Sequence, residues 1–292
     1  MLKTTGRAMA RQKINTSILL VGMTIGLTAC FWMFFWIVQE LRFESNYANA
    51  DRVYRVEMEL KDGDITSMGA ATPTPLAPTL QSTFPEIELA SRIHPFAQSS
   101  IRVGEQSFNE DRIMAVDPSF LEIFNLNILS GDLYTALNNT NSIVLTESIV
   151  MKYFGKEANI IGKLIRIDEE NSMQITAVIH DLPANTHFDF EILIPLEFAH
   201  KAGREIAPNY WHRFDEIYTY VLAAKGTDRL ALESKLALVQ QQHVQGSEDV
   251  LYLRPLQAIR FASDVVYDFA SHTNTNTLYF LLLISILIFA MA

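Results

Sequence analysis

The sequence is poor in the residues that build disulfide, metal and redox sites. It contains one cysteine, Cys30, and its seven histidines are scattered along the chain. A single cysteine excludes a disulfide scaffold and any cysteine-rich zinc or iron–sulfur site. Glycine supplies only 12 of 292 residues, which excludes a collagen-like chain, and a hydrophobic content of 49% excludes a disordered one.

Positive charge is also scarce. The chain has 23 Lys and Arg residues against 33 Asp and Glu residues, a net charge of -10. A nucleic-acid-binding protein needs a basic face to neutralise phosphates, so this balance argues against nucleic acid as a partner.

The motifs of common enzyme classes are missing. The sequence has no G-x-x-x-x-G-K-[ST] loop for ATP, no H-E-x-x-H, no G-x-S-x-G and no EF-hand loop. The nearest approach to a metal site is a short stretch of the chain with four candidate ligands: His180, Asp181, His187 and Asp189. Their spacing, across Pro183, favours a polar turn with one satisfied histidine over a set of ligands.

Two other groups of residues have a plain structural interpretation. The acidic pairs Asp62/Asp64 and Glu169/Glu170 are more typical of solvated turns than of paired catalytic carboxylates. The aromatic pair Tyr210–Trp211 is more typical of a core than of a ligand platform. We therefore expect no catalytic residue, no cofactor and no bound metal, and the substrate-binding residues stay unknown.

A long apolar run near the N-terminus predicts a membrane helix. No charged residue occurs from Ile14 to Gln39, and the 21 residues Ile18–Val38 would span about 31 Å as a helix, enough for a bilayer core. The basic residues of the chain's start all precede this run: Lys3, Arg7, Arg11 and Lys13. Because basic segments stay in the cytoplasm, we expect a cytoplasmic N-terminus and an extracytoplasmic Glu40.

Two features inside this run leave alternatives open. Gly22 and Gly26 form a G-x-x-x-G pattern, which is either a helix-packing seam or the ordinary glycine content of a membrane helix. The tetrapeptide Leu27-Thr28-Ala29-Cys30 resembles the lipobox of a bacterial lipoprotein, in which Cys30 would be lipidated. The apolar run continues to Val38, which favours a span over lipidation.

A second apolar run, Leu278–Ala292, has 15 residues without a charge. A helix of that length covers only about 22 Å, which is short for a bilayer. It reads as the first part of a second membrane helix, and the chain as an N-terminal piece of a longer membrane protein.

The acidic stretch between the two runs predicts an α+β domain. Its apolar periodicity indicates strands at 51–60, 87–93, 142–145, 164–168, 173–179, 188–194 and 217–223. In the first strand Tyr54, Val56, Met58 and Leu60 take one face, and we expect Arg55, Glu57 and Glu59 to face solvent. Helix signals occur at Thr74-Pro75, at Asp117-Pro118, from Thr146 to Phe154 before Gly155, and from a cap at Thr227.

Several strings in this domain occur in the order found in one known family. They are Phe43-Glu44-Ser45-Asn46-Tyr47 with its continuation to Val56, Val116-Asp117-Pro118-Ser119-Phe120 up to Gly131-Asp132, Val144-Leu145-Thr146-Glu147-Ser148 with Phe154-Gly155 and Ile161-Gly162-Lys163, Ile175–Pro183 followed by Thr186-His187-Phe188, and Leu253-Arg254-Pro255-Leu256 through Ile259. As a set, this sequence resembles the FtsX/MacB family of ABC-transporter permeases over nearly its whole length.

The resemblance implies a domain plan. A cytoplasmic segment (1–17) precedes membrane helix 1 (18–39), a MacB-like periplasmic core domain (40–276) and the start of membrane helix 2 (277–292). The core domain would have two lobes, a porter-like lobe formed by 41–109 and 181–276 and an inserted lobe formed by 110–180.

The resemblance also implies a function. A permease of this kind sits in the bacterial plasma membrane, dimerises or pairs with a second permease, and recruits a cytoplasmic ATPase, here expected as a separate subunit. Its extracytoplasmic domain couples helix movement to the efflux or extraction of peptides, lipoproteins or drugs. The alternative from the layout alone is a sensor, since receptors also place an extracytoplasmic domain between two membrane helices. Beyond residue 292 a permease would continue into a loop and two further apolar spans, and a sensor into a coiled-coil signalling helix.

Overall fold

The computed structural model describes residues 13–63, 65–157, 159–201, 209–211 and 216–291. Outside the described residues therefore lie the basic residues Lys3, Arg7 and Arg11, and also Asp64 and His212. The chain divides into two compact units, residues 1–43 with 273–292 and residues 44–272, and each is described by itself.

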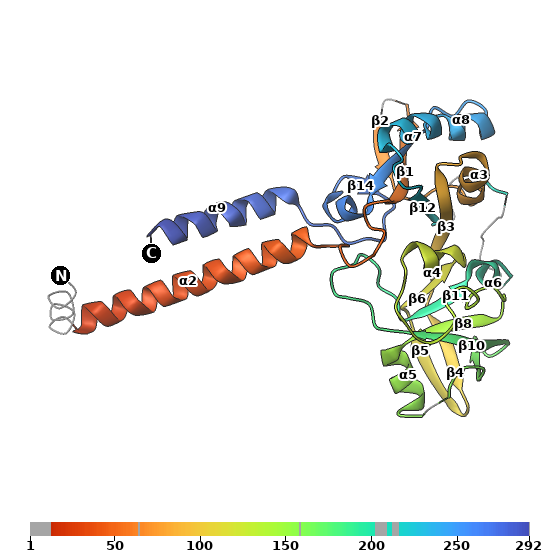
Figure 1. Cartoon of the computed structure of the whole chain (residues 1–292), viewed down its shortest axis with the longest axis horizontal. Helices are drawn as coiled ribbons and strands as arrows, with labels where there is room; N and C mark the ends of the chain where they lie inside the picture. Colours follow the sequence, from red (N-terminus) through yellow and green to blue (C-terminus); the bar gives the residue numbers. More distant parts are fainter. Residues whose placement is uncertain (1–12, 64, 158, 202–208, 212–215, 292) are drawn as a thin grey trace. The chain divides into compact units, whose positions relative to one another are not determined.

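The first unit is a pair of antiparallel helices, α2 (Lys13–Leu41) and α9 (Thr275–Met291) (Figure 1). Among the described residues, only the part of α2 from Leu20 to Leu41 is long and apolar enough to cross a membrane. The apolar stretch of α9, Thr275–Ala290, is shorter. A Cβ placed on Gly26 would lie 3.3 Å from Ile288, and Cys30 Sγ donates to the carbonyl of Ser285 at 3.4 Å. Gly26 thus lies where the helices touch, whereas nothing lies within 4 Å of a Cβ on Gly22.

The second unit is built on one mixed sheet, which has 14 strands in the described part of the chain. The strands are β1 (Val53–Asp62), β2 (Ile65–Gly69), β3 (Ile87–Phe96), β4 (Ser99–Val103), β5 (Gln106–Glu110), β6 (Ile113–Val116), β7 (Ile128–Gly131), β8 (Ser142–Thr146), β9 (Leu164–Ile167), β10 (Asn171–Ile179), β11 (Ile192–Pro195), β12 (Tyr218–Ala223), β13 (Val250–Pro255) and β14 (Val265–Val266). Their order is β14-β2-β1-β12-β3-β6-β11-β8-β10-β9-β4-β5, with β13 added to β1 and β7 to β10.

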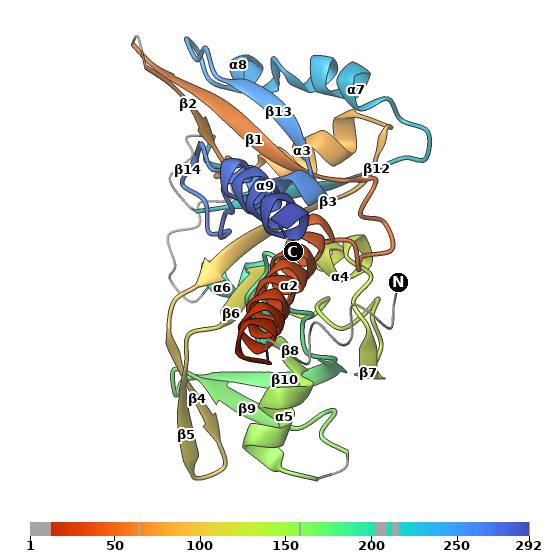
Figure 2. The ribbon, with the colours of Figure 1, turned by 90° about the vertical axis from the view of Figure 1, so that its left-hand side faces the viewer.

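Short helices complete this unit. They are α3 (Leu76–Thr83), α4 (Ser119–Ile123), α5 (Glu147–Phe154), α6 (Leu196–Lys201), α7 (Arg229–Leu236), α8 (Val239–His243) and the 3-10 helix η1 (Leu256–Phe261). Figure 2 shows α7 and α8 beside β13 at one end of the sheet and α5 near β9 and β10 at the other. The predicted α+β class is therefore confirmed, with a large mixed sheet.

Three apolar clusters hold the sheet and helices together. One is rich in aromatic residues and includes Phe120, Phe124, Phe188, Phe190 and Tyr220. The second packs α5 and α6 against β4, β6, β8, β9 and β10, and the third packs α3 and α7 against β1, β12 and β13. The division into lobes 41–109 plus 181–276 and 110–180 stays a prediction. In the sheet, β4 from the first of these ranges pairs with β9 from the second.

The structure corrects three local predictions. The strand β1 is buried on both faces, because Arg55 and Glu57 are 0% and 1% exposed. The segment Phe188–Phe190 is not part of a strand, and β11 begins only at Ile192, since the two phenylalanines pack into the aromatic cluster instead. The helix after Thr227 is capped by Asp228, whose carboxylate accepts a hydrogen bond from Ala231 N at 3.0 Å.

A fourth correction concerns Asp117. Its carboxylate does not cap α4, since that helix has no side-chain cap, and it binds the Arg92 guanidinium instead. The first turn of α4 therefore relies on backbone groups such as the carbonyl of Asp117, which accepts from Phe120 N at 3.0 Å.

Candidate functional site

Each of the four residues considered as metal ligands has a different hydrogen-bond or ion-pair partner. In the described part of the chain, no group of three or more His, Cys, Asp or Glu residues is placed to hold a metal ion. The partners are Glu147 for His180, Ser148 for Asp181, Arg112 for Asp189 and Glu44 for His187. Only His187 is buried.

The other sequence candidates are spread over the surface. Glu169 pairs with Arg102 at 2.6 Å, and Glu170 is exposed. The Trp211 ring stacks on His243 with centroids 3.8 Å apart, while Tyr210 is 37% exposed. No site joins these groups in the described residues.

A buried polar network brings together the two ends of residues 44–272. We call it the junction cluster, and its members are Glu44, Arg55, Glu57, His187, Tyr220, Arg254, Asp268 and His272. It begins at the first residue of the unit and ends at the last.

Glu44 fixes the start of the unit. Its backbone has a left-handed φ of 61°, and its N–H donates to the carbonyl of Asn185 at 2.8 Å. Its fully buried carboxylate accepts from the backbone N–H of His187 at 2.5 Å, from His187 Nδ1 at 2.7 Å and from the Thr186 hydroxyl at 3.0 Å. The string around Glu44 and the Thr186-His187-Phe188 string, far apart in the sequence, therefore meet at one carboxylate.

His187 links this carboxylate to the sheet. Its Nδ1 lies 2.7 Å from Glu44 Oε1 and its Nε2 lies 2.6 Å from the Tyr220 hydroxyl, so the tautomer with a proton on Nδ1 donates to Glu44 and accepts from Tyr220. Burial raises the pKa of Tyr220 well above its usual value, although the positive charge of Arg55 lowers it. The phenol therefore stays protonated and donates.

Arg55 continues the network across the sheet. In the register of β1 and β12 it lies directly opposite Tyr220, and in that of β1 and β13 directly opposite Arg254. Its guanidinium binds Glu57 Oε1 at 2.5 Å, and Arg254 Nε donates to the same oxygen at 2.6 Å. A fully buried arginine and a partly buried one thus share one buried carboxylate.

Asp268 joins the end of the unit to β1. Its two oxygens lie 2.9 and 2.7 Å from the terminal nitrogens of Arg55, and its side chain is 2% exposed. His272 Nε2 lies 3.2 Å from Asp268 Oδ2. Between them, the Phe269 ring packs on His187 and Tyr218, with centroids 5.6 and 4.6 Å away.

The junction cluster is suited to holding chain segments rather than to chemistry. Its acids and bases are paired inside the unit, and its phenol is protonated and fully buried. Removing one partner of such a pair leaves a buried charge and costs about 3–5 kcal/mol. The two ends of residues 44–272 are therefore tied to neighbouring strands, Glu44 through His187 to β12 and Asp268 to β1.

Most of this cluster could not be predicted from the sequence pattern. Binary patterning assigns charged residues to solvent, so it placed Arg55 and Glu57 on the outer face of β1. The one signal in the sequence was the pair of charges on this strand, Arg55 and Glu57. If the strand has sheet neighbours on both sides, such charges are buried and need partners of opposite charge.

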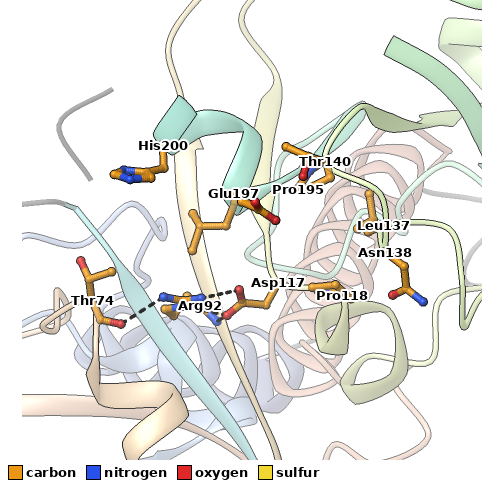
Figure 3. Close-up of a pocket in the computed structure, with 11 residues that line it drawn as sticks. Thr74, Arg92, Asp117, Pro118, Leu137, Asn138, Thr140, Pro195, Glu197 and His200 are labelled. Atoms are coloured by element: carbon orange, nitrogen blue, oxygen red, sulfur yellow. Dashed lines mark hydrogen bonds and ion pairs between the residues drawn. The ribbon is translucent and has the colours of Figure 1, made fainter. Parts of the chain in front are cut away.

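A separate pocket of about 280 Å³ lies where α3, α4 and α6 begin. Figure 3 shows Arg92 on its floor between Thr74 and Asp117. Arg92 Nε and Nη2 each lie 2.8 Å from an Asp117 oxygen. The Glu197 carboxylate at its rim pairs with Lys201 at 2.7 Å, and this hydrogen bond lowers the pKa of Glu197. The charges are balanced in pairs, so the pocket presents no surplus charge to a ligand.

Comparison with known proteins gives one family and several similar folds. The family model described as the MacB-like periplasmic core domain matches residues 16–239, well over half of the chain. No curated protein matches the chain.

Three solved structures share the fold. A permease protein domain from Porphyromonas gingivalis superposes with a TM-score of 0.61 at 21% identity, covering 81% of this chain and 99% of that one. The periplasmic region of MacB from Actinobacillus actinomycetemcomitans gives 0.51 at 13% identity, covering 69% and 88%. The extracellular domain of the noncanonic ABC-type transporter YknZ from Gram-positive bacteria gives 0.51 at 10% identity, covering 69% and 98%.

Proposed function

This chain belongs to the family with a MacB-like periplasmic core domain, and on that premise we propose that it acts as a permease subunit of an ABC transporter. The apolar helix α2 anchors it in the bacterial plasma membrane with its N-terminus in the cytoplasm, and residues 44–272 form its extracytoplasmic domain. The substrates are peptides, lipoproteins or drugs taken from the far side of the membrane.

The junction cluster is the observation that carries this proposal. A domain that relays helix movement needs both of its ends fixed to a rigid body, and no catalytic group. Here Glu44 and Asp268 are fixed to neighbouring strands through His187, Tyr220 and Arg55. The energy comes from ATP hydrolysis by a cytoplasmic ABC ATPase that the permease recruits, and the working unit contains two permeases.

The sensor alternative places the same domain above a signalling coiled coil. The junction cluster favours the transporter, because it locks the two ends of the domain together. A sensor that shifts one helix against the other needs its two domain ends to move apart.

Orientation and partner are tested together in the source organism. A cysteine replaces the exposed Glu105 in a Cys30→Ala background, and intact cells are treated with a membrane-impermeant maleimide. We expect labelling without cell lysis, since position 105 lies in the extracytoplasmic domain. The tagged protein, purified from membranes, should bring down an ABC ATPase in stoichiometric amount.

The control is the Cys30→Ala chain, which should not be labelled. Purification of a histidine kinase or chemoreceptor component instead of an ATPase would support the sensor. Labelling only after lysis would refute the extracytoplasmic placement.

The coupling itself is tested by hydrogen exchange on the purified complex, with ATP and vanadate against ADP. Segments 44–60 and 265–272 should change protection together in the wild type. In Arg55→Met, which separates Asp268 from β1, only one of the two segments should respond.

A further inference from the structure

Tyr267 is an exposed aromatic residue in a strained backbone conformation. Its φ of 54° lies in the left-handed region, which is unfavourable for residues other than glycine, and its side chain is 65% exposed. The residues on both sides of it are fixed, since Val266 belongs to β14, which pairs with β2, and Asp268 binds Arg55 at 2.7 Å. The ring is therefore turned outward by a rigid turn.

The loop Leu182–Asn185 is a second exposed apolar segment. The sequence has no Asp, Glu, Lys or Arg from residue 182 to residue 188, and Pro183 and Ala184 are exposed. The carbonyl of Asn185 accepts a hydrogen bond from the backbone N–H of Glu44 at 2.8 Å. This loop is therefore fixed to the first residue of the domain.

The junction cluster brings Tyr267 to the same end of the domain. The ring of Phe269, two residues further along the chain, lies 5.6 Å from the ring of His187. The backbone N–H of His187 in turn donates to the Glu44 carboxylate. Both apolar segments are thus held close to Glu44.

The chain path places Glu44 close to the membrane surface. It follows the last residue of the apolar segment Leu20–Leu41 by three residues, which span at most about 11 Å. The headgroup layer on each side of a bilayer is itself about 5–7 Å deep. When α2 spans a bilayer, groups beside Glu44 are therefore within reach of the headgroups.

The chemistry of the two segments suits a lipid surface. A tyrosine has an apolar ring and a hydroxyl that hydrogen-bonds to water and to headgroups, so it is favoured at the membrane interface. A loop without charged side chains enters the headgroup layer without the cost of desolvating an ion. The conformation of Tyr267 is unfavourable in the domain alone, and burial of its ring among lipids offsets that strain.

We propose that Tyr267 and the loop Leu182–Asn185 form a membrane rim, which rests in the headgroup layer of the bilayer that α2 spans. The rim supports the domain at points other than its two chain connections, and so limits how far the domain tilts over the membrane. The inference rests on α2 spanning a membrane, which is part of the proposed function, and requires no transport activity.

The test uses the full chain in nanodiscs of phosphatidylethanolamine and phosphatidylglycerol. Single cysteines are introduced in a Cys30→Ala background by Ala184→Cys and Tyr267→Cys and are labelled with a nitroxide. Power-saturation EPR then compares access of oxygen, which concentrates in lipid, with access of a water-soluble nickel chelate. We expect the ratio of oxygen access to nickel access to be severalfold higher at both rim positions than at the control position in water.

That control is Leu164→Cys, because Leu164 is apolar and equally exposed, at 65%. It lies opposite Gln174 in the register of β9 and β10, about 16 Å of strand before β10 ends at Ile179. Nickel access at 184 and 267 as high as at 164 would overturn the rim, and so would protection of both positions from both reagents, which would mean that protein covers them.

A label introduced by Phe31→Cys separates this inference from the proposed function. Phe31 is 71% exposed on α2, and its label should be accessible mainly to oxygen. Lipid contact at 31 without lipid contact at 184 and 267 would refute the rim alone. Nickel access at 31 would refute the membrane span, and with it the rim.

A second measurement tests whether the domain itself needs the Tyr267 ring. In detergent micelles Tyr267→Gly should raise the Tm of the full chain, because glycine adopts a positive φ without strain. The matched control is Tyr134→Gly, which removes a tyrosine that is 66% exposed but has a negative φ, and should lower Tm. A lower Tm for Tyr267→Gly would show that the ring stabilises the domain's own packing and would remove the argument for lipid.

Discussion

Replacing Glu44 by alanine should strongly destabilise the extracytoplasmic domain. The substitution removes a fully buried carboxylate that accepts three hydrogen bonds. The Thr186 hydroxyl retains Tyr47 as a partner at 2.9 Å, but the backbone N–H and the ring Nδ1–H of His187 are left without acceptors. Each orphaned buried donor costs about 1–3 kcal/mol, so the two together cost about 4 kcal/mol.

The assay is urea and thermal unfolding of a fragment comprising residues 40–276. This fragment contains the compact unit 44–272 with its own cores, and the three similar structures are themselves isolated domains. A loss of about 4 kcal/mol should lower Tm by roughly 8–16 °C in a domain of this size. Glu44→Gln keeps one acceptor oxygen and should lose about half as much.

The matched control is Glu105→Ala, which removes an exposed carboxylate in the turn after β4 and should change stability by less than about 0.5 kcal/mol. If Glu44→Ala cost less than about 1 kcal/mol, Glu44 would not fix the start of the domain, and the mechanical role given to the junction cluster would be wrong.

Three further substitutions test the packing by urea unfolding of the same fragment. Arg55→Met leaves two buried carboxylates without their shared partner and should cost about 3–5 kcal/mol; a neutral effect would mean that water or other side chains replace the guanidinium. Gly131→Ala should destabilise the fragment by more than about 2 kcal/mol, since φ is 97° and a Cβ would lie 2.4 Å from the Thr176 carbonyl oxygen. Its control is Gly104→Ala, where φ is 58° and a Cβ would meet no atom within 4 Å, and this change should cost only about 1 kcal/mol. Equal losses of stability in the two variants would contradict the clash. Asp228→Ala removes the cap of α7 and should cost about 1 kcal/mol, and no loss would show that water caps this helix equally well.

Local patterns predicted the elements whose signals lie within a few residues. The helix α5 begins after Thr146 and ends at Gly155, which has a φ of 62°. The strands β9 and β10 flank the polar turn that the sequence indicated, and they pair as a hairpin. In both cases the stop signal and the apolar period occur in one short stretch of chain.

Long-range polar pairing was beyond the reach of such patterns. Arg55 was placed on a solvent face because, apart from Glu57, the residues that surround it, Tyr220 and Asp268, lie more than a hundred residues away in the sequence. The alternation of Phe188 and Phe190 is as typical of a strand as that of β11, but the rings pack edge-on to Phe120 and no strand forms there. Whether an apolar residue joins a ladder or an aromatic cluster depends on neighbours that a sequence window does not contain.

The position of β1 has a consequence for how this protein is made. Its local partner is β2, but its other two partners, β12 and β13, lie near residues 220 and 254. Such distant pairing forms slowly, because the long chain segment between the strands loses entropy before the strand contacts stabilise it. As the chain emerges from the membrane, β1 has an open edge until almost the whole domain has been translocated. Newly exported chains therefore pass through a stage with a long exposed strand, which is open to edge-to-edge pairing with other chains until β12 and β13 are in place.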